Sequence, residues 1–336
     1  MTANQNQHEI SESNLKNINS TATILKSNNF PARTIKKSIP ETAPDGKPWP
    51  KISIVTVSFN MVNYIEDTIL SVIAQEYPNL EYIVIDGGSK DGTVDIIKKY
   101  EQWITYWISE PDSGMYDAIN KGFKHATGEI MAYINADDKF HYNAFFSAAS
   151  IFTTLEDVDW ILGRASFYNE EGTIVDVKDL KKWSKLNYYL GEYQWIQQES
   201  VFWRRNLWLK AGSKINTELK YAGDYELWLR FFRFAKLYSV ETIFAGFRFR
   251  TKDQLSLDKM DSYVYEVDMV TNLSALPRED KYAIKKMKFI RNFVLKIPLI
   301  RRFKFIRRNI ERTFDYPPKI CYDFGSRKFF KNYSSQ

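Results

Sequence analysis

Apolar positions in the first half of the chain alternate between two spacings. Residues 52–57 form a short run of mostly β-branched side chains, which predicts a buried strand. After this run the isoleucines recur every fourth position, which predicts a helix with one apolar face: Ile65, Ile69 and Ile73. A second strand at residues 82–85 and a second helix at 91–100 repeat the order. Strand, helix, strand and helix in succession predict a right-handed crossover and a parallel sheet.

The alternation continues further along the chain. A third helix is expected over residues 115–126, and the strand after it ends at Asp137. Another strand is expected at residues 158–162, and a further helix begins at Asp224. Aromatic residues are dense over residues 181–205, and we expect most of them in the core or in the wall of a cleft. These elements predict an α/β fold class with a mostly parallel sheet flanked by helices.

The charge of the chain is distributed unevenly. The formal net charge is +6, but residues 281–312 hold 12 Lys and Arg residues against Glu311 alone, a balance of +11. The rest of the chain therefore carries −5. A mildly acidic body argues against a nucleic-acid-binding protein with a generally basic surface. It predicts one localised element that attracts anions.

Apolar residues recur at spacings of three and four between the basic residues of 281–312, and Pro298 is expected to divide the segment into two short helices. The pattern is typical of a helix that lies in a membrane interface. Basic side chains near an anionic surface contribute roughly 1 kcal/mol each. The alternative is that the apolar stripe packs on the rest of the protein while the charges face solvent. Nucleic-acid binding is the weaker alternative, because no recognised motif accompanies the charge.

Composition limits the remaining chemistry. Cys321 is the single cysteine, so neither an intramolecular disulfide nor a cysteine-based zinc site can form, and the three histidines are scattered. Residues 1–50 are polar and are expected to be a flexible leader. The sequence shows no signal peptide and no apolar run of about 20 residues. We therefore expect a cytoplasmic protein, with the basic segment as the candidate contact to the inner face of the plasma membrane.

Two adjacent carboxylates, Asp137 and Asp138, follow the strand that ends near residue 136. Open α/β sheets bind their ligands at the carboxyl ends of their strands. Two carboxylates there suit a hard divalent cation, which in turn can hold the diphosphate of a nucleotide. Asp-Asp after a strand also occurs in ordinary turns and helix caps, and taken alone the pair favours neither interpretation.

A glycine-containing turn follows the second strand. Asp86 at the strand end can accept a hydrogen bond from a nucleotide base, and Gly87 lets the backbone approach a ligand closely. The glycine spacing is not that of a dinucleotide-binding fingerprint, and no P-loop lysine follows. The alternative is an ordinary turn in which Asp91 caps the next helix, and Asp91 itself fits that role.

A third polar segment spans residues 109–122. Glu110 and Asp112 precede a helix whose positive N-terminus could face phosphates. Asn120 and Lys121 lie on that helix and could reach a diphosphate, although a solvated lysine is the commoner case. Further along, Asp224 follows a glycine in the half of the fold where a base acting on an acceptor would be needed. An acid at a helix start is more often a cap.

The order of these segments resembles that of family 2 glycosyltransferases, in particular the non-processive bacterial members that build cell-surface glycans. The resemblance covers about residues 51–256, and no single motif in it is specific. The segments that carry it are residues 54–60, 86–93, 109–122, 127–129, 135–138 and 222–226.

The resemblance implies a GT-A type nucleotide-diphospho-sugar transferase fold, inversion at the anomeric carbon and a divalent metal, Mg²⁺ or Mn²⁺. It implies that Asp86 contacts the base, Asp137 the ribose and Asp138 the metal. Asp224 would be the catalytic base that deprotonates the acceptor hydroxyl. The predicted donor nucleotide-binding residues are Thr56, Ser58, Asn60, Asp86, Gly87, Asp112, Asn120, Lys121 and Asp137.

The chain departs from the family pattern at two places. Asn135 stands where many relatives have a further acid, so the metal would depend more on Asp138 and on the phosphates of the donor. The Gln-x-x-Arg-Trp signature of processive members is absent, because residues 199–204 read Glu-Ser-Val-Phe-Trp-Arg. This second departure favours transfer of a single sugar over polymer synthesis.

The sequence therefore predicts an inverting hexosyltransferase that moves one sugar from a nucleotide-diphosphate donor, expected to be a UDP-sugar, to a glycan or lipid-linked acceptor in cell-surface polysaccharide synthesis. The predicted divisions are a leader at 1–50, a catalytic domain at 51–256 and a helical basic C-terminal extension at 257–336. A nucleotidyltransferase of related fold is an alternative, but residues 58–63 offer no basic phosphate-gripping side chain. A non-catalytic membrane-docking module is another, and the four aspartates Asp86, Asp137, Asp138 and Asp224 argue against it.

Overall fold

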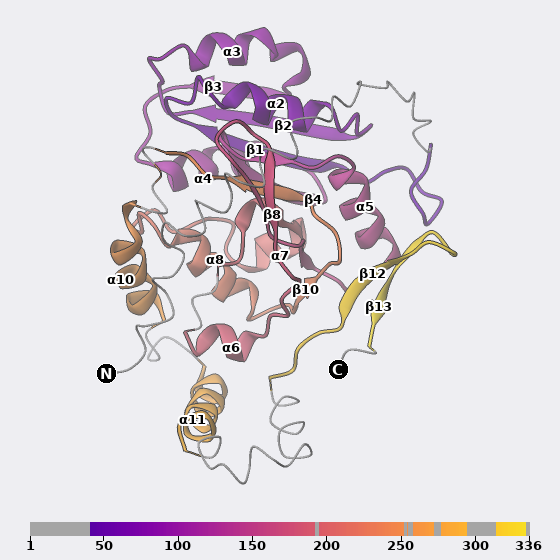
Figure 1. The fold of residues 1–336 in the computed structure, drawn as a ribbon, viewed down its shortest axis with the longest axis vertical. Helices are drawn as coiled ribbons and strands as arrows, with labels where there is room; N and C mark the ends of the chain where they lie inside the picture. The colour runs from indigo at the N-terminus through magenta and orange to yellow at the C-terminus, as the bar shows by residue number, and fades with distance from the viewer. Residues whose placement is uncertain are drawn as a thin grey trace.

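The computed structural model describes residues 41–191, 195–251, 254, 258–271, 277–293 and 314–333. Within this part of the chain a seven-stranded sheet forms the centre, with the strand order β10-β6-β9-β4-β1-β2-β3 (Figure 1). Its strands are β1 Ile52–Ser58, β2 Leu80–Asp86, β3 Tyr106–Ser109, β4 Ile130–Asn135, β6 Trp160–Leu162, β9 Val201–Arg204 and β10 Leu237–Ser239. β1 pairs in parallel with β2 and with β4, and β2 with β3, whereas β9 runs antiparallel to β4 and β6. The predicted mostly parallel α/β sheet is thus confirmed.

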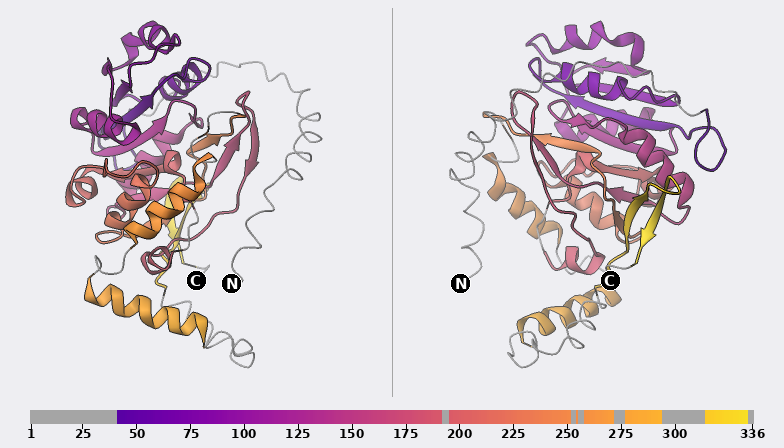
Figure 2. Two further views of the ribbon diagram at one scale, coloured as in Figure 1. Left: turned by 90° about the vertical axis from the view of Figure 1, so that its left-hand side faces the viewer. Right: turned by 45° about the vertical axis from the view of Figure 1, so that its right-hand side comes forward.

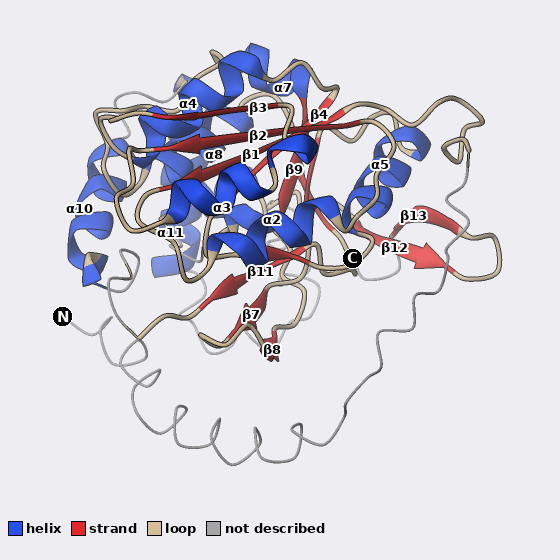
Figure 3. Cartoon of the chain, turned by 90° about the horizontal axis from the view of Figure 1, so that it is seen from above, coloured by secondary structure: helices blue, strands red, loops and turns tan. Residues whose placement is uncertain are grey.

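Helices cover both faces of the sheet, as Figure 3 shows from above. Their bounds are α2 Ile65–Ile73, α3 Thr93–Lys99, α4 Met115–His125, α5 Ala144–Thr154, α6 Lys185–Tyr189, α7 Arg205–Lys210 and α8 Gly223–Phe231. Two short 3-10 helices, η1 Glu101–Trp103 and η2 Gln198–Ser200, precede β3 and β9. The predicted helices and strands of residues 51–235 agree with these elements to within a few residues.

The alternation of side chains along β1 explains how one short strand serves two cores. Val55 and Val57 point to the face covered by α4, and Ile54 to the face covered by α2. All three are buried, with at most 6% of their surface exposed. The crossover helices therefore fix the sheet from both sides and hold the carboxyl ends of its strands rigidly.

A second, four-stranded sheet packs beside the carboxyl end of β4. It consists of β5 Lys139–Phe140, β7 Ser166–Tyr168, β8 Ile174–Val177 and β11 Ala245–Arg248, in the order β5-β11-β7-β8. β5 begins directly after Asp138, and β11 pairs with it antiparallel. This pairing brings the arginines at the end of β11 beside the two aspartates.

The predicted boundary of the leader is wrong by about ten residues. Ala43 and Trp49 are buried, and the Trp49 ring packs edge-on against Tyr77 and Phe146, with ring centroids 5.8 Å and 5.0 Å apart. A Pro-rich segment can still pack when it carries one large aromatic anchor, because a buried Trp removes a large apolar surface from water. Residues 1–40 lie outside the described part of the chain.

The C-terminal extension is not wholly helical. It contains α10 Met260–Val270 and α11 Arg278–Asn292, but also a hairpin of β12 Lys319–Asp323 and β13 Lys328–Asn332, visible at the side of the domain in Figure 2. The hairpin adds to the domain through a bridge between Val240 and Ile320. Alternation places Ile320 and Phe329 inward, where both are buried, so these residues form a strand pair rather than a helix.

The basic segment 281–312 is described only up to Phe293, so the predicted division at Pro298 lies outside the described residues. In α11, Ile284 and Met287 are buried in the same core as α4 and α8, and Ile290 packs against it. This part of the apolar stripe therefore packs on the catalytic domain, which was the alternative to membrane contact. No helix in the described ranges is both long and apolar enough to span a bilayer.

Candidate active site

Strand register brings the predicted polar residues to one edge of the sheet. Ser58 lies opposite Asp86 across β1 and β2, and Asp86 lies opposite Ser109 across β2 and β3. On the other side, Val57 is the partner of Asn135 at the end of β4. Because parallel strands end at the same edge, residues that are 77 positions apart in the chain, such as Ser58 and Asn135, become near neighbours.

Buried oxygen atoms without a protein hydrogen-bond partner gather at this edge in the described part of the chain. η2 lies here as well, since β9 runs antiparallel to β4 and begins where β4 ends. The atoms are Ser58 Oγ, Asn135 Oδ1, Asp138 Oδ2, Gln197 Oε1, Gln198 Oε1 and Glu199 Oε1. A buried polar atom without a partner costs about 1–3 kcal/mol. Six acceptors left open in one place indicate a site for a ligand that brings hydrogen-bond donors or a cation.

The two aspartates after β4 are buried and differ in their partners. Asp137 forms an ion pair with Arg250, whose Nε lies 2.9 Å from Asp137 Oδ2. Asp138 Oδ1 accepts the backbone N–H of Arg248 at 2.9 Å, and Thr68 donates to the Asp138 carbonyl at 2.7 Å. The second carboxylate oxygen of Asp138 is the one left open. Asp138 is therefore held in place while one oxygen remains available to a ligand.

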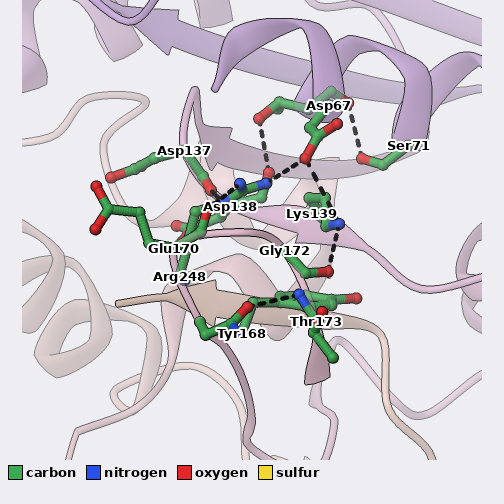
Figure 4. A network of polar contacts seen from close by, with 12 residues as sticks. Asp67, Ser71, Asp137, Asp138, Lys139, Tyr168, Glu170, Gly172, Thr173 and Arg248 are labelled. Carbon is green, nitrogen blue, oxygen red and sulfur yellow. Dashed lines mark hydrogen bonds and ion pairs between the residues drawn. The ribbon is translucent and has the colours of Figure 1, made fainter. Parts of the chain in front are cut away.

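Arg248 ties this edge to the second sheet, as Figure 4 shows. Its Nε donates to the Asp137 carbonyl at 2.7 Å, and its guanidinium pairs with Asp67 of α2 at 2.7 Å. A further bond reaches the carbonyl of Glu170 at 2.9 Å. Only 2% of the Arg248 surface is exposed. Arg248 thus fixes the backbone on which Asp137 and Asp138 stand.

Several carboxyl groups gather near Tyr133 on β4. Burial raises the pKa of Tyr133, and the nearby carboxylates Asp224, Glu199 and Asp138 raise it further. Burial also raises the pKa of Glu199 to about 8, with Asp137 and Asp224 adding to the effect. The pKa of Asp138 is raised by burial and by its neighbours Asp137 and Glu199. Residues from three separate segments therefore form one acidic site.

Asp86 organises the loop at the end of β2. Its carboxylate accepts the backbone N–H groups of Gly88 and Ser89 at 3.1 and 2.9 Å and the hydroxyl of Ser109 at 2.6 Å. Ser89 and Ser109 line a hollow of about 580 Å³ together with Lys90, Val94, Lys98, Trp107 and Ile108. The structure thus places Asp86 beside an open, partly basic hollow, with its side chain serving the loop.

The three residues in and after β1 that were predicted to bind the donor nucleotide point in different directions. The cause is the pleat of the strand and the turn that follows it. Thr56 is buried and its hydroxyl lies 3.1 Å from that of Tyr82, so it serves the core and does not face the edge. Ser58 is buried at the edge with its hydroxyl open. Asn60 has a positive φ of 52° and its Oδ1 accepts the N–H of Lys90 at 3.0 Å. Thr56 therefore serves the core, whereas Ser58 keeps a buried open hydroxyl and Asn60 is exposed with its Oδ1 engaged by the loop.

Gly87 and Asp112 lie against each other. A Cβ at position 87 would come within 2.7 Å of Asp112 Oδ2 and 3.2 Å of the Phe59 ring, so only glycine allows the two loops to approach this closely. Asp112 Oδ1 also accepts the N–H of Gly114 at 2.8 Å, at the residue before α4. The two loops that carry these predicted donor-binding residues therefore meet at the strand edge.

Asn120 and Lys121 lie on α4, as predicted, but both have protein partners. The amide of Asn120 donates to the Ile215 carbonyl at 2.8 Å and accepts the Ile215 N–H at 2.7 Å, so both of its polar ends are engaged by one loop. Lys121 pairs with Glu110 at 2.9 Å and with Asp117 at 3.6 Å. The hydrogen bond to Glu110 raises the pKa of Lys121. The prediction that they reach a diphosphate is not supported, because nearer partners outcompete a distant anion.

Asp224 stands in the first turn of α8, on the opposite side of the edge from Asp86. Its Oδ1 accepts the N–H of Tyr225 at 2.8 Å and the hydroxyl of Tyr116 at 3.3 Å. Burial raises the pKa of Asp224 to about 6. A carboxylate with a pKa near neutrality can both take up and hold a proton under ordinary conditions, which suits a general base.

The loop before Asp224 is held from the C-terminal extension. Glu266 of α10 accepts the backbone N–H groups of Lys220, Tyr221 and Ala222 at 2.9, 2.8 and 2.8 Å. These three donors precede α8 directly. One carboxylate thereby fixes the backbone that carries the candidate base.

Sequence reasoning missed four residues that shape the site, namely Glu199, Arg248, Arg250 and Glu266. Glu199 appeared there only as part of a departure from the processive signature. No local pattern marks the other three, since each acts on a segment at least 44 positions away. The only available signal for Arg248 and Arg250 was that two arginines, with one residue between them, follow a short apolar run.

The aspartates were tested for their fit to the divalent cation implied by the family resemblance. Carboxylate oxygens are the ligands that Mg²⁺ and Mn²⁺ prefer, and the open Oδ2 of Asp138 is one. The described residues contain no group of three or more His, Cys, Asp or Glu side chains placed to hold a metal. The residues therefore fit a cation held by few protein ligands and completed by phosphate oxygens, as Mg²⁺ commonly is in nucleotide sites.

Comparison with known proteins supports a common family for this site. Residues 53–214 match the model of glycosyl transferase family 2. An uncharacterized glycosyltransferase of Mycobacterium tuberculosis is 44% identical over 92 residues, which are 27% of this chain and 35% of the relative. TuaG of Bacillus subtilis, named for teichuronic acid biosynthesis, is 40% identical over 94 residues, or 27% of this chain and 37% of TuaG. The chain covers less than two thirds of the length of these relatives.

Among solved structures, Staphylococcus aureus TarS residues 1–349, determined in complex with UDP-GlcNAc, resembles this chain with a TM-score of 0.57. The alignment covers 78% of this chain and 79% of that chain at 18% identity. At this identity the likeness shows the fold. It extends over more of this chain than the sequence matches do, and it confirms the GT-A type expected from the motif order.

Proposed function

Residues 53–214 of this chain belong to glycosyltransferase family 2, and from that premise we propose that the chain transfers a single sugar from a nucleotide-diphosphate donor to an acceptor hydroxyl. The observation that carries the proposal is the gathering of Asp138, Glu199 and Asp224 near Tyr133, with Asp137 beside Asp138 and near Glu199, at the carboxyl edge of the sheet where buried oxygen atoms are left open. Such an edge is where α/β folds bind nucleotides and where a base opposite the donor can act.

We infer that the donor is a UDP-sugar whose nucleotide lies along the ends of β1 and β2. The open hydroxyl of Ser58, the loop ordered by Asp86 and the close approach of Gly87 to Asp112 support this placement. The TarS structures with UDP-GlcNAc and with UDP supply the chemical precedent in the same fold. Asp137 is the residue proposed for the ribose, and release of its ion pair with Arg250 would accompany binding.

In the proposed reaction the acceptor oxygen attacks the anomeric carbon while its proton passes to Asp224 Oδ1 or Oδ2. The bond between the anomeric carbon and the diphosphate oxygen breaks, and its electron pair leaves with the diphosphate. Attack from the face opposite the leaving group inverts the anomeric configuration. Tyr116 supports this role, because its hydrogen bond stabilises the ionised form of Asp224.

Asp138, with Asp137 beside it, is proposed to hold Mg²⁺ or Mn²⁺, which when bound would neutralise charge on the leaving diphosphate. Arg250 is the nearest cationic side chain to the same carboxylates. Arg248 keeps both aspartates in position through their backbone. Glu199, near Asp137 and Asp224, is proposed to accept hydrogen bonds from sugar hydroxyls through its open Oε1.

We propose a glycan or lipid-linked acceptor in cell-surface polysaccharide synthesis, on the basis of the name of TuaG and the absence of the processive signature. The sequence places the end of the catalytic domain at residue 256. We propose that α10, which follows this end, also contributes to the site. A contact of the basic segment with the inner face of the plasma membrane stays a proposal, now limited to the side chains of α11 that do not pack inward.

The experiment is incubation of the purified chain with UDP-sugars and Mn²⁺, with detection of released UDP and of inorganic pyrophosphate. A glycosyltransferase releases UDP, and the Asp224→Asn variant should bind UDP as the wild type does but release none from the donor in the presence of acceptor. Release of pyrophosphate from a nucleoside triphosphate and a sugar phosphate would instead identify a nucleotidyltransferase. Failure to bind any nucleoside diphosphate would refute the proposal.

A further inference from the structure

Two aromatic rings outside the nucleotide edge, Trp195 and Tyr263, are stacked on each other, and Trp195 is half open to solvent. The Trp195 and Tyr263 ring centroids lie 4.6 Å apart with an interplanar angle of 27°. Trp195 exposes 45% of its surface, although most aromatic residues around it in the sequence are buried. The Trp195 ring is thus held by a stacking partner while a large part of it stays exposed, which is what a stacking platform for a ligand requires.

The position of Tyr263 is fixed relative to the candidate base. Tyr263 lies on α10, one helical turn before Glu266, whose carboxylate binds the three backbone N–H groups preceding Asp224. The same helix buries Val267 completely and bonds Tyr225 through Thr271, with the hydroxyls 3.1 Å apart. The helix that carries the platform ring is therefore anchored to the residues that carry the base.

The electrostatics place the pair beside the acidic site. The pKa of Tyr188 is raised by burial and also by Tyr263 and Asp224. The pKa of Tyr133, near the carboxylates of Asp138, Glu199 and Asp224, is raised by burial and again by both Asp224 and Tyr263. Tyr263 and Asp224 thus act on the same two phenols from nearby.

We propose that Trp195 and Tyr263 form a platform on which a pyranose ring of the acceptor stacks, with its hydroxyl groups directed toward Asp224 and Glu199. This inference rests on the proposed glycosyl transfer and names the acceptor subsite of that reaction. An aromatic face carries negative charge density, and the C–H groups on one face of a pyranose are weakly positive, so the two attract. The hydroxyl groups at the ring edge then meet the open carboxylate oxygens.

A sugar fits this place better than a lipid chain does. Tyr263 acts on the same phenols as Asp224, and Glu199, whose Oε1 has no partner, belongs to the same acidic site. A hydrocarbon chain packed here would bury these groups without partners, at a cost of about 1–3 kcal/mol each. A pyranose offers several hydroxyl donors within one ring. The substrate class that the platform selects is therefore carbohydrate.

Three probes test the platform, namely the methyl β-pyranosides of glucose, galactose and N-acetylglucosamine. Their binding to the full chain is measured by saturation-transfer NMR in the presence of UDP. Trp195→Ala should weaken binding of the best probe about five- to tenfold, the size of one aromatic stacking contact. Trp195→Tyr should retain most of it. The matched control is Trp103→Ala, because Trp103 is 50% exposed on η1 at the opposite edge of the sheet.

The platform is refuted if no pyranoside binds to the wild type, if Trp195→Ala binds as the wild type does, or if Trp103→Ala loses as much. It is also refuted if farnesyl phosphate, and not a pyranoside, loses affinity in Trp195→Ala. UDP affinity is measured separately and should be unchanged in all three variants. Wild-type protein that fails to bind UDP would refute the proposed function, while the pyranoside results would still decide the platform.

Discussion

Single residues in this site owe their chemistry to burial among like charges. Asp138, Glu199 and Asp224 each have a raised pKa, and burial is the largest cause in every case. Without ligands such a cluster destabilises the fold once it ionises. Natural sites accept this cost where function needs open oxygen atoms.

The pH dependence of transfer should report Asp224. A base acts in its ionised form, so with a pKa of about 6 the rate should fall roughly tenfold per pH unit below pH 6 and level off above it. Tyr116→Phe removes a hydrogen bond that favours the ionised form, so the acid limb should move to higher pH. The measurement is kcat/KM against pH. Tyr265→Phe, at a residue 71% exposed on α10, is the control and should leave the limb in place.

Asp138→Asn should separate activity from stability. Loss of a transition-state contact at the diphosphate should lower kcat by about 100-fold or more. Because the folded-state pKa of Asp138 is raised, its ionisation costs stability as pH rises above the unfolded value, and this cost is fully present above the folded pKa. In EDTA the Asn variant should therefore gain Tm over the wild type at pH 8 and little at pH 4.

The control for that comparison is Asp179→Asn, at a side chain that is fully exposed. It should change neither kcat nor the pH dependence of Tm. An Asp138→Asn protein that keeps most of the wild-type kcat, or that gains the same Tm at both pH values, would contradict the role given to Asp138.

Among the elements, α10 supports the candidate site although it lies after residues 53–214, which match the family. Its Glu266 satisfies three N–H groups at the start of α8, where helices leave backbone donors without intrahelical partners. The described part of the extension thus completes the catalytic region instead of following it as a separate body.

Glu266→Ala should lower the free energy of unfolding by about 1–3 kcal/mol, because three backbone donors lose their acceptor and only some regain one from water. It should also lower kcat more than UDP affinity, since the loop it releases carries Asp224 and not the nucleotide edge. Denaturant unfolding and UDP titration check the two parts. Asp261→Ala on the exposed side of the same helix is the control, with an expected change within about 0.5 kcal/mol.

Over the whole molecule, α11 divides into an inward stripe and an exposed basic face. Ile284 and Met287 are buried, whereas Phe289 and Phe293 are 59% and 63% exposed and stack on each other at 5.1 Å. The exposed lysines of the helix lie on the same open surface, namely Lys285, Lys286 and Lys288. Removing the whole segment would also remove core residues, so surface variants test membrane contact more cleanly than truncation.

Changing Lys285, Lys286 and Lys288 to Glu should weaken binding to anionic phosphatidylglycerol vesicles at low salt. The partition coefficient measured by sedimentation should fall at least about 100-fold, at roughly 1 kcal/mol per lost lysine. The control changes the same net charge elsewhere, at the exposed Lys98, Lys124 and Lys210. Equal loss in both triple variants would indicate general charge attraction and would rule out α11 as the membrane contact.

The sequence by itself predicted the strand and helix order and the edge where Ser58, Asp86, Asp137 and Asp138 lie. Those predictions depend on residues near one another in the chain, where spacing and β-branching set strands and helices directly. The register of parallel strands then follows from the crossovers, and the carboxyl ends meet without further information.

The tertiary structure decided which polar side chains face the site and which are engaged elsewhere. Asn120 turned to the backbone of Ile215, and Thr56 to Tyr82, because partners distant in sequence came within hydrogen-bond reach. Glu266 and Arg248 entered from segments without a motif for the same reason. A local pattern fixes the direction of a backbone, but the partner of a buried polar group depends on which segments pack around it, and that is settled only when the whole chain is folded.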